Sequence, residues 1–446
     1  MLIEFRVENH RSILTEQALT MEAGRVGEVG DARLRRVGAL SLLPVAALFG
    51  ANASGKSNVL SAIGFLRDAI LDSHAAWPPS GGVPRDAFAW GVGPLEPSLF
   101  EVTYLLGEVR FQYGFTINQT RVLEEWLFAW PKGRRQSWFE RDADRFRFGD
   151  HLRGENRSIA ELTRTNALFL STAAQHQHEQ LMPHYEWSRA LRTVRVEGYR
   201  ERFADAIPAS AAASMFAALA AASAAEAGSS GWVRLNDMLP RPTESADPLG
   251  QLRRLDDRDS ERLRRLLQAA DVGITQFKLE DSPGPGGARS KDPSRQVSLL
   301  HQTRSGGGWL TLERESLGTK ALFQLGPLVL DTLRTGGVLI VDELESSLHS
   351  LLVLEIVRLF NDPDANPNNA QLIFTTHDTA LLGTATGEPP LRRDQVWLTE
   401  KDPEGATQLT PLTDFKPRKE ENLERGYLQG RYGAVPILGP LVPGKG

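Results

Sequence analysis

"VAALFGANASGKS", residues 45–57, is the stretch that decides the fold. Its apolar start, residues 45–49, predicts a fully buried strand. A helix is expected from Ser57 to about Ser73, because apolar residues recur there at helical spacing. Between the two, Gly50 to Ser57 fits the pattern G-x-x-x-x-G-K-[ST] completely. The sequence therefore predicts a phosphate-binding loop (P-loop) in the strand–loop–helix context that its mechanism needs.

The residue types in this loop suit a nucleoside triphosphate. Glycines let backbone N–H groups surround phosphates, and the following helix adds the positive end of its dipole. Lys56 would reach the β- and γ-phosphates, and the Ser57 hydroxyl would ligate Mg²⁺. The expected nucleotide-binding residues of the loop are Gly50, Asn52, Ala53, Ser54, Gly55, Lys56, Ser57 and Asn58.

A second apolar run, Val338 to Val341, ends in two acids and predicts another buried strand. We expect Asp342 to hold the Mg²⁺ shell together with Ser57, and Glu343 to polarise the attacking water. Two adjacent acids at a strand end could also merely cap the next helix. A complete P-loop elsewhere in the chain favours the catalytic interpretation.

A third buried strand is expected in "QLIFTTHD", residues 371–378, and it ends at His377. A histidine at a strand tip can sense or stabilise a γ-phosphate, since its ordinary pKa lies close to neutral pH. A purely structural histidine is the alternative. Lys56, Glu343 and His377 are thus the expected catalytic residues.

The stretch "ERESLGTKAL", residues 313–322, predicts the start of an apolar helix. Ser316 suits a helix cap, but Gly318 in the first turn costs about 1 kcal/mol relative to alanine. A glycine there makes sense where backbone must approach a phosphate closely.

Composition sets the outer limits. The chain of 446 residues has no cysteine, which excludes disulfides, thiolate zinc sites and cysteine nucleophiles. The net charge of −5 argues against a generally basic, DNA-coating surface. No signal peptide is evident at the N-terminus, and charged residues and glycines interrupt the most apolar stretch, 321–341. We therefore expect a cytoplasmic protein without a membrane segment.

The remaining patterns divide the chain into parts. Strand-like segments separated by short polar turns, from Leu99 to about Gly149, predict an antiparallel meander. The region from about 155 to 270 reads as mainly helical and includes an Ala/Ser-rich stretch, 209–230. The expected divisions are an N-terminal lobe with the P-loop and the meander (1–154), a helical insertion (155–270), a C-terminal lobe with the other motifs (271–415) and a tail (416–446).

The order of these motifs resembles that of the ABC-type ATPases, and within them the SMC, Rad and RecF branch. Lys56 and Asp342 are 286 residues apart, too far for a compact small GTPase or an uninterrupted RecA-like core. The opening "FRVENHRSI" (5–13) is similar to that branch's N-terminal strand and turn, which implies a place for Arg11 near the phosphates. The implied fold is an α/β ABC-ATPase head with a mixed, largely parallel P-loop sheet, an antiparallel meander and a mainly helical insertion.

The resemblance also assigns two further motifs. Ser316 and Gly318 match two positions of the L-S-G-G-Q signature of these ATPases, whereas Leu317 and Thr319 depart from it. The implied signature residues, acting on a second copy's nucleotide, are Ser316, Gly318 and Thr319. The implied D-loop residues are Glu345, Ser346 and Ser347.

Three stretches resemble a narrower group. "DELESSLH" (342–349) is similar to the overcoming-lysogenisation-defect type of ATPase. "NALFLSTAAQ" (166–175) and "FKPRKEENLERGYLQGRYGAVP" (415–436) resemble stand-alone ATP-binding proteins of prokaryotic anti-phage systems, with the AriA component of PARIS systems as one relative. Such proteins are typically encoded beside an effector, often a Toprim-type nuclease.

The resemblance implies a slow, Mg²⁺-dependent ATPase with ATP and Mg²⁺ as cofactors. It would act as a nucleotide-sandwich homodimer, or part of a larger assembly, that controls a separate effector protein. A RecF- or Rad-like DNA repair ATPase is the alternative; it would need a basic channel, and the net charge counts against DNA binding. No intrinsic nuclease is expected, because the chain after His377 is too short for a Toprim-like domain. The tail segment 424–436 could dock a partner or pack on its own core.

Overall fold

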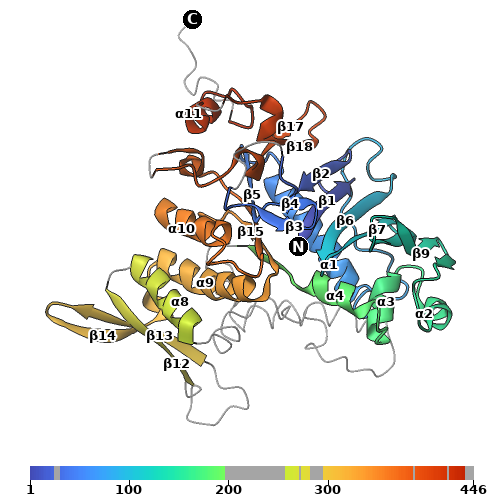
Figure 1. Cartoon of the computed structure of the whole chain (residues 1–446), viewed down its shortest axis with the longest axis horizontal. Helices are drawn as coiled ribbons and strands as arrows, with labels where there is room; N and C mark the ends of the chain where they lie inside the picture. The colour runs from blue at the N-terminus through green and yellow to red at the C-terminus, as the bar shows by residue number, and fades with distance from the viewer. Residues whose placement is uncertain are drawn as a thin grey trace, which may run out of the picture. The chain divides into compact units, whose positions relative to one another are not determined.

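The computed structural model describes residues 1–24, 31–195, 257–270, 273–281, 295–384, 387–418 and 421–436 (Figure 1). The chain forms two compact units. The first contains Met1–Arg195, Asp331–Glu345 and Ser350–Gly446, and the second contains Val196–Leu330 and Ser346–His349. The Ala/Ser-rich stretch 209–230, with most of the predicted insertion, lies outside the described residues, so the predicted domain boundaries stay predictions.

The first unit is built on a six-stranded P-loop sheet with the order β11-β15-β16-β5-β17-β18. Strands β11 to β17 in this order run parallel, and β18 is antiparallel to β17. The bounds are β5 Val45–Gly50, β11 Leu191–Arg195, β15 Val338–Asp342, β16 Gln371–Thr375, β17 Val396–Lys401 and β18 Thr407–Pro411. Every residue of β5 and β16 is buried, as expected for apolar parallel strands covered on both faces.

A seven-stranded antiparallel sheet with the order β10-β9-β8-β7-β6-β1-β2 forms the other layer of this unit. Alternating burial along β6 and β8 shows one face toward the core. Its strands are β1 Leu2–Glu8, β2 Gln17–Thr20, β6 Ser98–Leu106, β7 Val109–Ile117, β8 Val122–Trp130, β9 Gln136–Asp142 and β10 Arg145–Phe148. A small ribbon pairs β3 Arg35–Val37 with β4 Leu40–Leu42.

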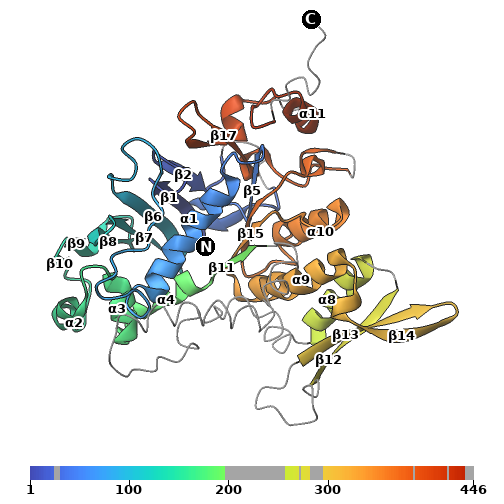
Figure 2. The same ribbon diagram turned by 180° about the vertical axis from the view of Figure 1, so that it is seen from behind.

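Helix α1, Lys56–Asp72, lies between the two sheets (Figure 2). It contacts β5, β15 and β16 of the P-loop sheet and β1 and β6 of the antiparallel sheet. Its buried residues Ile63 and Leu66 belong to the same core as Phe100 and Ile340. Helix α10, Ser350–Asn361, covers the P-loop sheet from the other side (Figures 1 and 2). The P-loop therefore leads into a helix that both sheets hold in place.

Short helices complete the first unit. They are α2 Asn156–Leu162, α3 Phe169–Gln175, α4 Met182–Arg189 and α11 Leu423–Leu428, with 3-10 turns η4 Thr379–Leu382, η5 Arg393–Gln395 and η6 Leu412–Phe415. The "NALFLSTAAQ" stretch forms α3, whose first N–H groups, on Phe169 and Leu170, donate to the buried Glu125 at 2.6 and 3.0 Å. A carboxylate at a helix N-terminus stabilises it, so this motif has a structural role in the meander.

The second unit contains α8 Asp257–Ala270, α9 Leu317–Thr335 as far as Leu330, and the turn η3 Leu312–Arg314. A three-stranded antiparallel sheet joins them, with β12 Ile274–Asp281, β13 Arg295–Thr303 and β14 Gly306–Thr311. Leu263 of α8 and Phe277 of β12 contact α9 at Gly326 and Phe323.

The predicted α/β fold class is confirmed, with a mixed P-loop sheet and an antiparallel meander. The mainly helical prediction for residues 155–270 missed strand β11, which extends the P-loop sheet beside β15. Among the described residues, no helix combines the length and apolar character needed to cross a bilayer.

Candidate nucleotide site

Three neighbouring parallel strands bring the predicted motifs to one edge of the P-loop sheet. β5 leads into the P-loop, β15 ends at Asp342, and β16 ends two residues before His377. β16 lies between β5 and β15. Ligands of open parallel sheets bind outside the carboxyl ends of such strands.

The P-loop turns tightly before α1. Ala53 and Gly55 have φ values of 62° and 103°, and the second of these favours glycine strongly. Asn52 and Ala53 are exposed at the tip of the loop. Lys56 folds back over the loop and donates from Nζ to the carbonyl oxygens of Gly50 and Ala51, at 2.8 and 3.1 Å.

Lys56 is the cation at the centre of the site, with 6% of its surface exposed. Burial lowers the pKa of its ammonium group to about 8, and the nearby Glu343, Glu345 and Asp342 oppose that shift. Three carboxylates therefore lie near one partly desolvated ammonium group, although they follow Lys56 in the sequence by nearly 290 residues.

The predicted metal ligands are in contact with one another. Ser57 Oγ donates to Asp342 Oδ1 at 2.9 Å. Thr375 Oγ1 donates to the same carboxylate oxygen at 2.7 Å and accepts a hydrogen bond from the Glu343 backbone N–H at 2.7 Å. Glu343 itself has a φ of 53°, an uncommon conformation for a non-glycine residue, in which the Thr375 contact holds it.

Thr375 is a site residue that the sequence reasoning missed. Its hydroxyl contacts the Asp342 carboxylate and the Glu343 backbone, and the residue is completely buried. The signal lay in "TTHD", where polar residues begin two positions before His377, but only the pairing of β15 with β16 gives Thr375 its partners.

A hydrogen bond links His377 to Glu345: the His377 backbone N–H donates to Glu345 Oε1 at 2.5 Å. Burial and the positive charge of Lys56 lower the pKa of His377 below its ordinary value, so the imidazole is neutral at pH 7. Glu345, a predicted D-loop residue, thus joins the segment after β15 to the segment after β16.

Ser316, Gly318 and Thr319 lie in the second unit, at the start of α9. Ser316 caps the helix, as predicted from its type: its Oγ accepts from the Thr319 N–H at 3.1 Å and lies 2.8 Å from the Thr319 hydroxyl. A Cβ on Gly318 would lie 2.9 Å from the carbonyl oxygen of Ser347, so the glycine permits this approach. Ser347, with Ser346, belongs to the same unit and has a φ of 64°. An approach of Gly318 to a phosphate stays a prediction.

Arg11 lies in the turn after β1 and pairs with an exposed acid. Its Nε is 3.0 Å from Asp86 Oδ2, and its backbone N–H donates to the Asp86 carbonyl at 2.7 Å. The next residue, Ser12, contacts the P-loop helix instead, by accepting from Asn58 Nδ2 at 2.6 Å. The predicted place of Arg11 near the phosphates remains a prediction.

The residues at this edge fit Mg²⁺. Magnesium is typically held in such sites by one or two carboxylates together with phosphate oxygens and waters. Ser57 and Asp342 supply adjacent hydroxyl and carboxylate oxygens of this kind. Among the described residues no cluster of three or more His, Cys, Asp or Glu side chains forms a metal site that the protein could complete alone. When bound, the ion would neutralise phosphate charge there.

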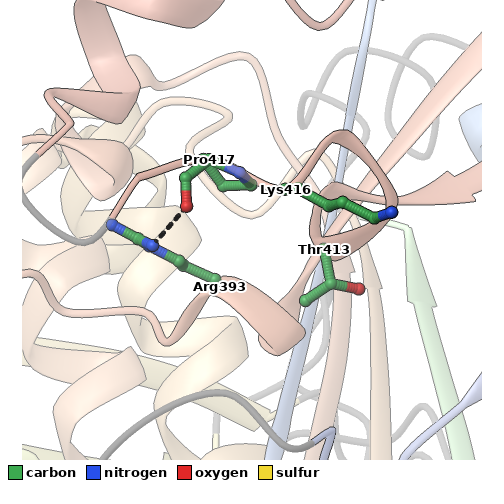
Figure 3. A pocket seen from close by; sticks show the side chains of 4 residues that line it. All are labelled: Arg393, Thr413, Lys416 and Pro417. Carbon is green, nitrogen blue, oxygen red and sulfur yellow. Dashed lines mark hydrogen bonds between the residues drawn. The ribbon is translucent and has the colours of Figure 1, made fainter.

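A separate pocket of about 240 Å³ is lined by Arg393, Thr413, Lys416 and Pro417 (Figure 3). The Arg393 guanidinium donates to the Pro417 carbonyl at 2.7 Å, so part of the pocket wall is fixed by that bond. None of these four residues belongs to the predicted nucleotide-site motifs, although Lys416 and Pro417 lie in the 415–436 stretch.

Three comparisons relate the chain to known proteins. The family described as "AAA domain, putative AbiEii toxin, Type IV TA system" matches residues 45–383. A search of the curated proteins finds no match. Among solved structures, the SMC head domain from Thermotoga maritima aligns with a TM-score of 0.38 and 12% identity, over 92% of this chain and 98% of that one. With the family match spanning most of its length, from the P-loop strand to the segment after His377, the chain belongs to this AAA family of P-loop ATPases.

Proposed function

We propose that the protein binds ATP with Mg²⁺ and hydrolyses it slowly, as a nucleotide-dependent dimerising switch that controls a separate effector in anti-phage defence. One observation carries the ATPase part: Lys56, the Ser57–Asp342 pair and Glu343 converge at one edge of the P-loop sheet. This combination is what phosphoryl transfer to water requires, since its catalysis depends on positioning and on charge stabilisation.

Each residue has a defined part in this proposal. Lys56, which now donates to two loop carbonyls, would turn its ammonium group to phosphate oxygens. Ser57 and Asp342 would hold the metal. Glu343 would accept the proton of the attacking water, and neutral His377 would donate a hydrogen bond near the γ-phosphate.

The dimer part of the proposal rests on the start of α9. This helix is 19 residues long, and its N-terminus is capped at Ser316. Helix N-termini favour phosphate oxygens because their first N–H groups lack helical partners. Leu317, in the first turn, is 60% exposed, which suits a surface that a second copy covers. The phosphate contacted there would belong to the nucleotide of the partner copy.

The defence role rests on resemblance. The name of the matched family includes a toxin and a toxin–antitoxin system, and the "DELESSLH", 166–175 and 415–436 stretches resemble anti-phage ATP-binding proteins. If the effector binds only the ATP-bound or only the ADP-bound protein, the rate of hydrolysis would set how long the effector stays bound or free.

ATP hydrolysis and oligomeric state test the proposal together. We expect Glu343→Gln to abolish hydrolysis and to accumulate a dimer on sizing with ATP and Mg²⁺, because it keeps the nucleotide contacts and removes the base. Glu404→Gln, in an exposed turn between β17 and β18, is the matched control. Monomeric Glu343→Gln under these conditions would overturn the dimer, and unchanged hydrolysis would overturn the assignment of Glu343.

Binding to duplex DNA distinguishes this proposal from the alternative, a RecF-like DNA repair ATPase. A RecF-like ATPase should bind DNA in the ATP state, with an affinity that falls steeply with salt. An effector-controlling switch should instead bind its partner protein in one nucleotide state, and DNA should not change the ATPase rate.

A further inference from the structure

Buried hydroxyl groups lie against the P-loop on the side of β17 and β18. The parallel register of β17 with β5 places Thr399 beside Gly50. Thr407 is on β18, and its backbone N–H donates to the Ser12 carbonyl at 2.7 Å. Thr399 and Thr407 are both completely buried. We refer to Ser12, Thr399 and Thr407 as the hydroxyl brace.

The first arm of the brace holds the Ser54 side chain. Thr399 Oγ1 lies 2.6 Å from Ser54 Oγ, and it donates to the Phe49 carbonyl oxygen at 3.2 Å. A hydroxyl has a single proton to donate. Because the Thr399 proton goes to Phe49, Ser54 must donate to Thr399. The Ser54 hydroxyl is therefore engaged on the side of β17.

The second arm holds the backbone of the same residue. Thr407 Oγ1 donates to the Ser54 carbonyl at 2.9 Å and lies 2.8 Å from Ser12 Oγ. The same proton count makes Ser12 the donor to Thr407. Ser12 in turn accepts from Asn58 Nδ2 at 2.6 Å. A directed chain thus runs from the first turn of α1, through Ser12 and Thr407, back into the P-loop.

The glycines of the motif make room for this brace. A Cβ on Gly50 would lie 2.3 Å from Thr399 Oγ1, and a Cβ on Gly55 would lie 1.9 Å from Thr407 Oγ1. Neither distance is possible without displacing the hydroxyl. The first and last glycines of G-x-x-x-x-G-K-S are therefore needed for contacts beneath the loop, whatever binds above it.

We propose that Ser12, Thr399 and Thr407 are positioning residues that hold the P-loop in the conformation that binds nucleotide phosphates. The inference rests on the proposed function, since it assumes that the loop binds ATP. A loop fixed before the ligand arrives loses less conformational freedom on binding, and this raises affinity. All three residues lie outside the segment 45–383 that the family match covers.

Nucleotide affinity is the quantity that the brace should change. In Thr407→Val, the Ser54 carbonyl loses its donor and Ser12 loses its acceptor, while side-chain volume is kept. We expect the dissociation constants of ATP and ADP to rise together by about tenfold. The two dissociation constants should rise equally, because the brace acts on the conformation of the loop and not on the γ-phosphate that distinguishes ATP from ADP.

Thr407→Ser separates positioning from stability. It keeps the hydroxyl and loses a buried methyl group, so it should lower the melting temperature and still bind ATP and ADP within about twofold of the wild type. Thr410→Val, at a partly exposed position of the same strand, is the control and should leave both dissociation constants unchanged. Ser12→Ala, at a partly exposed turn residue, should raise the dissociation constants of ATP and ADP as Thr407→Val does. It replaces Thr407→Val in the test if that variant does not fold.

The measurement is a titration of each purified variant with ATP and with ADP in the presence of Mg²⁺, next to its thermal unfolding curve. Wild-type protein that binds neither nucleotide would overturn the proposed function itself. Wild-type binding with unchanged affinity in folded Thr407→Val, or in Ser12→Ala, would overturn the brace and leave the ATPase proposal standing. Weak binding by Thr407→Ser as well would also contradict it, because the hydroxyl would then not be the group that matters.

Discussion

Replacing Thr375 with valine tests the reasoning at the centre of the site. The change keeps the volume of a completely buried side chain and removes a single hydroxyl. That hydroxyl donates to Asp342 Oδ1 at 2.7 Å and accepts from the Glu343 N–H at 2.7 Å. Valine therefore leaves the Asp342 carboxylate with one fewer donor and the Glu343 backbone N–H without its acceptor.

The size of the effect follows from these two bonds. A hydrogen bond to a charged group contributes about 1.5–3 kcal/mol, and a buried donor left without an acceptor costs about 1–3 kcal/mol. If the lost bond to Asp342 acts entirely on the geometry of hydrolysis, the hydrolysis rate should drop about tenfold to 150-fold, since tenfold corresponds to about 1.4 kcal/mol. The second loss should appear as reduced stability. Groups that orient metal ligands show effects of the same order, about 10- to 100-fold.

The assay is ATP hydrolysis over a range of Mg²⁺ concentrations, with the dissociation constant of ATP measured in parallel. We expect Thr375→Val to lower kcat and to need more Mg²⁺ for half-maximal rate, while Thr375→Ser restores both. A folded Thr375→Val protein that hydrolyses ATP within twofold of the wild type would refute the role of this hydroxyl. Equal losses in the valine and serine variants would refute it too.

Three further outcomes are expected. Lys56→Ala should abolish the rise in melting temperature that ATP gives the wild type, since the central cation of the site is gone; a persisting rise would contradict the placement of the phosphates. Burial lowers the pKa of His184 to about 3, and its Nδ1 lies 2.6 Å from the Tyr104 hydroxyl. The neutral form is therefore favoured in the folded state, whereas the unfolded chain binds a proton near pH 6.5. The free energy of unfolding should fall as the pH drops from 6.5 toward 3, by about 2 kcal/mol at pH 5. Urea unfolding at pH 7 and pH 5 should therefore show a smaller pH dependence in His184→Gln than in the wild type. Gly318→Ala should not gain the roughly 1 kcal/mol that alanine offers a helix, because its Cβ would crowd the Ser347 carbonyl at 2.9 Å; a full gain in thermal stability would refute that contact.

The parts of the site that could be predicted are those in which local pattern and chemistry coincide. Buried parallel strands have apolar runs, so β5, β15 and β16 were evident together with the polar residues at their ends. The P-loop motif then predicted that Lys56 binds phosphate oxygens.

The rest depends on pairing between distant segments. Thr375 and Thr399 are ordinary strand threonines until register sets them beside Asp342 and Gly50. Strand β11, "LRTVR", is short and half polar, so its sequence does not show that it pairs with β15. The tail 424–436 left two alternatives open, and the structure favours packing on the core: Tyr427 contacts the Phe49 ring at 5.7 Å between centroids.

The strand order has a consequence for biosynthesis. β5 leaves the ribosome early, but its two neighbours in the sheet are β16 and β17, which end at Thr375 and Lys401. At about 5–20 residues per second, the roughly 350 residues between Gly50 and Lys401 take on the order of 20–70 s to synthesise. Until β16 has been synthesised, the fully buried strand β5 has neither of its partners in the sheet. A ribosome-bound fragment that stops short of β17 lacks Thr399 and one of the two neighbours of β5, so the P-loop cannot reach its final surroundings until Lys401 has been synthesised.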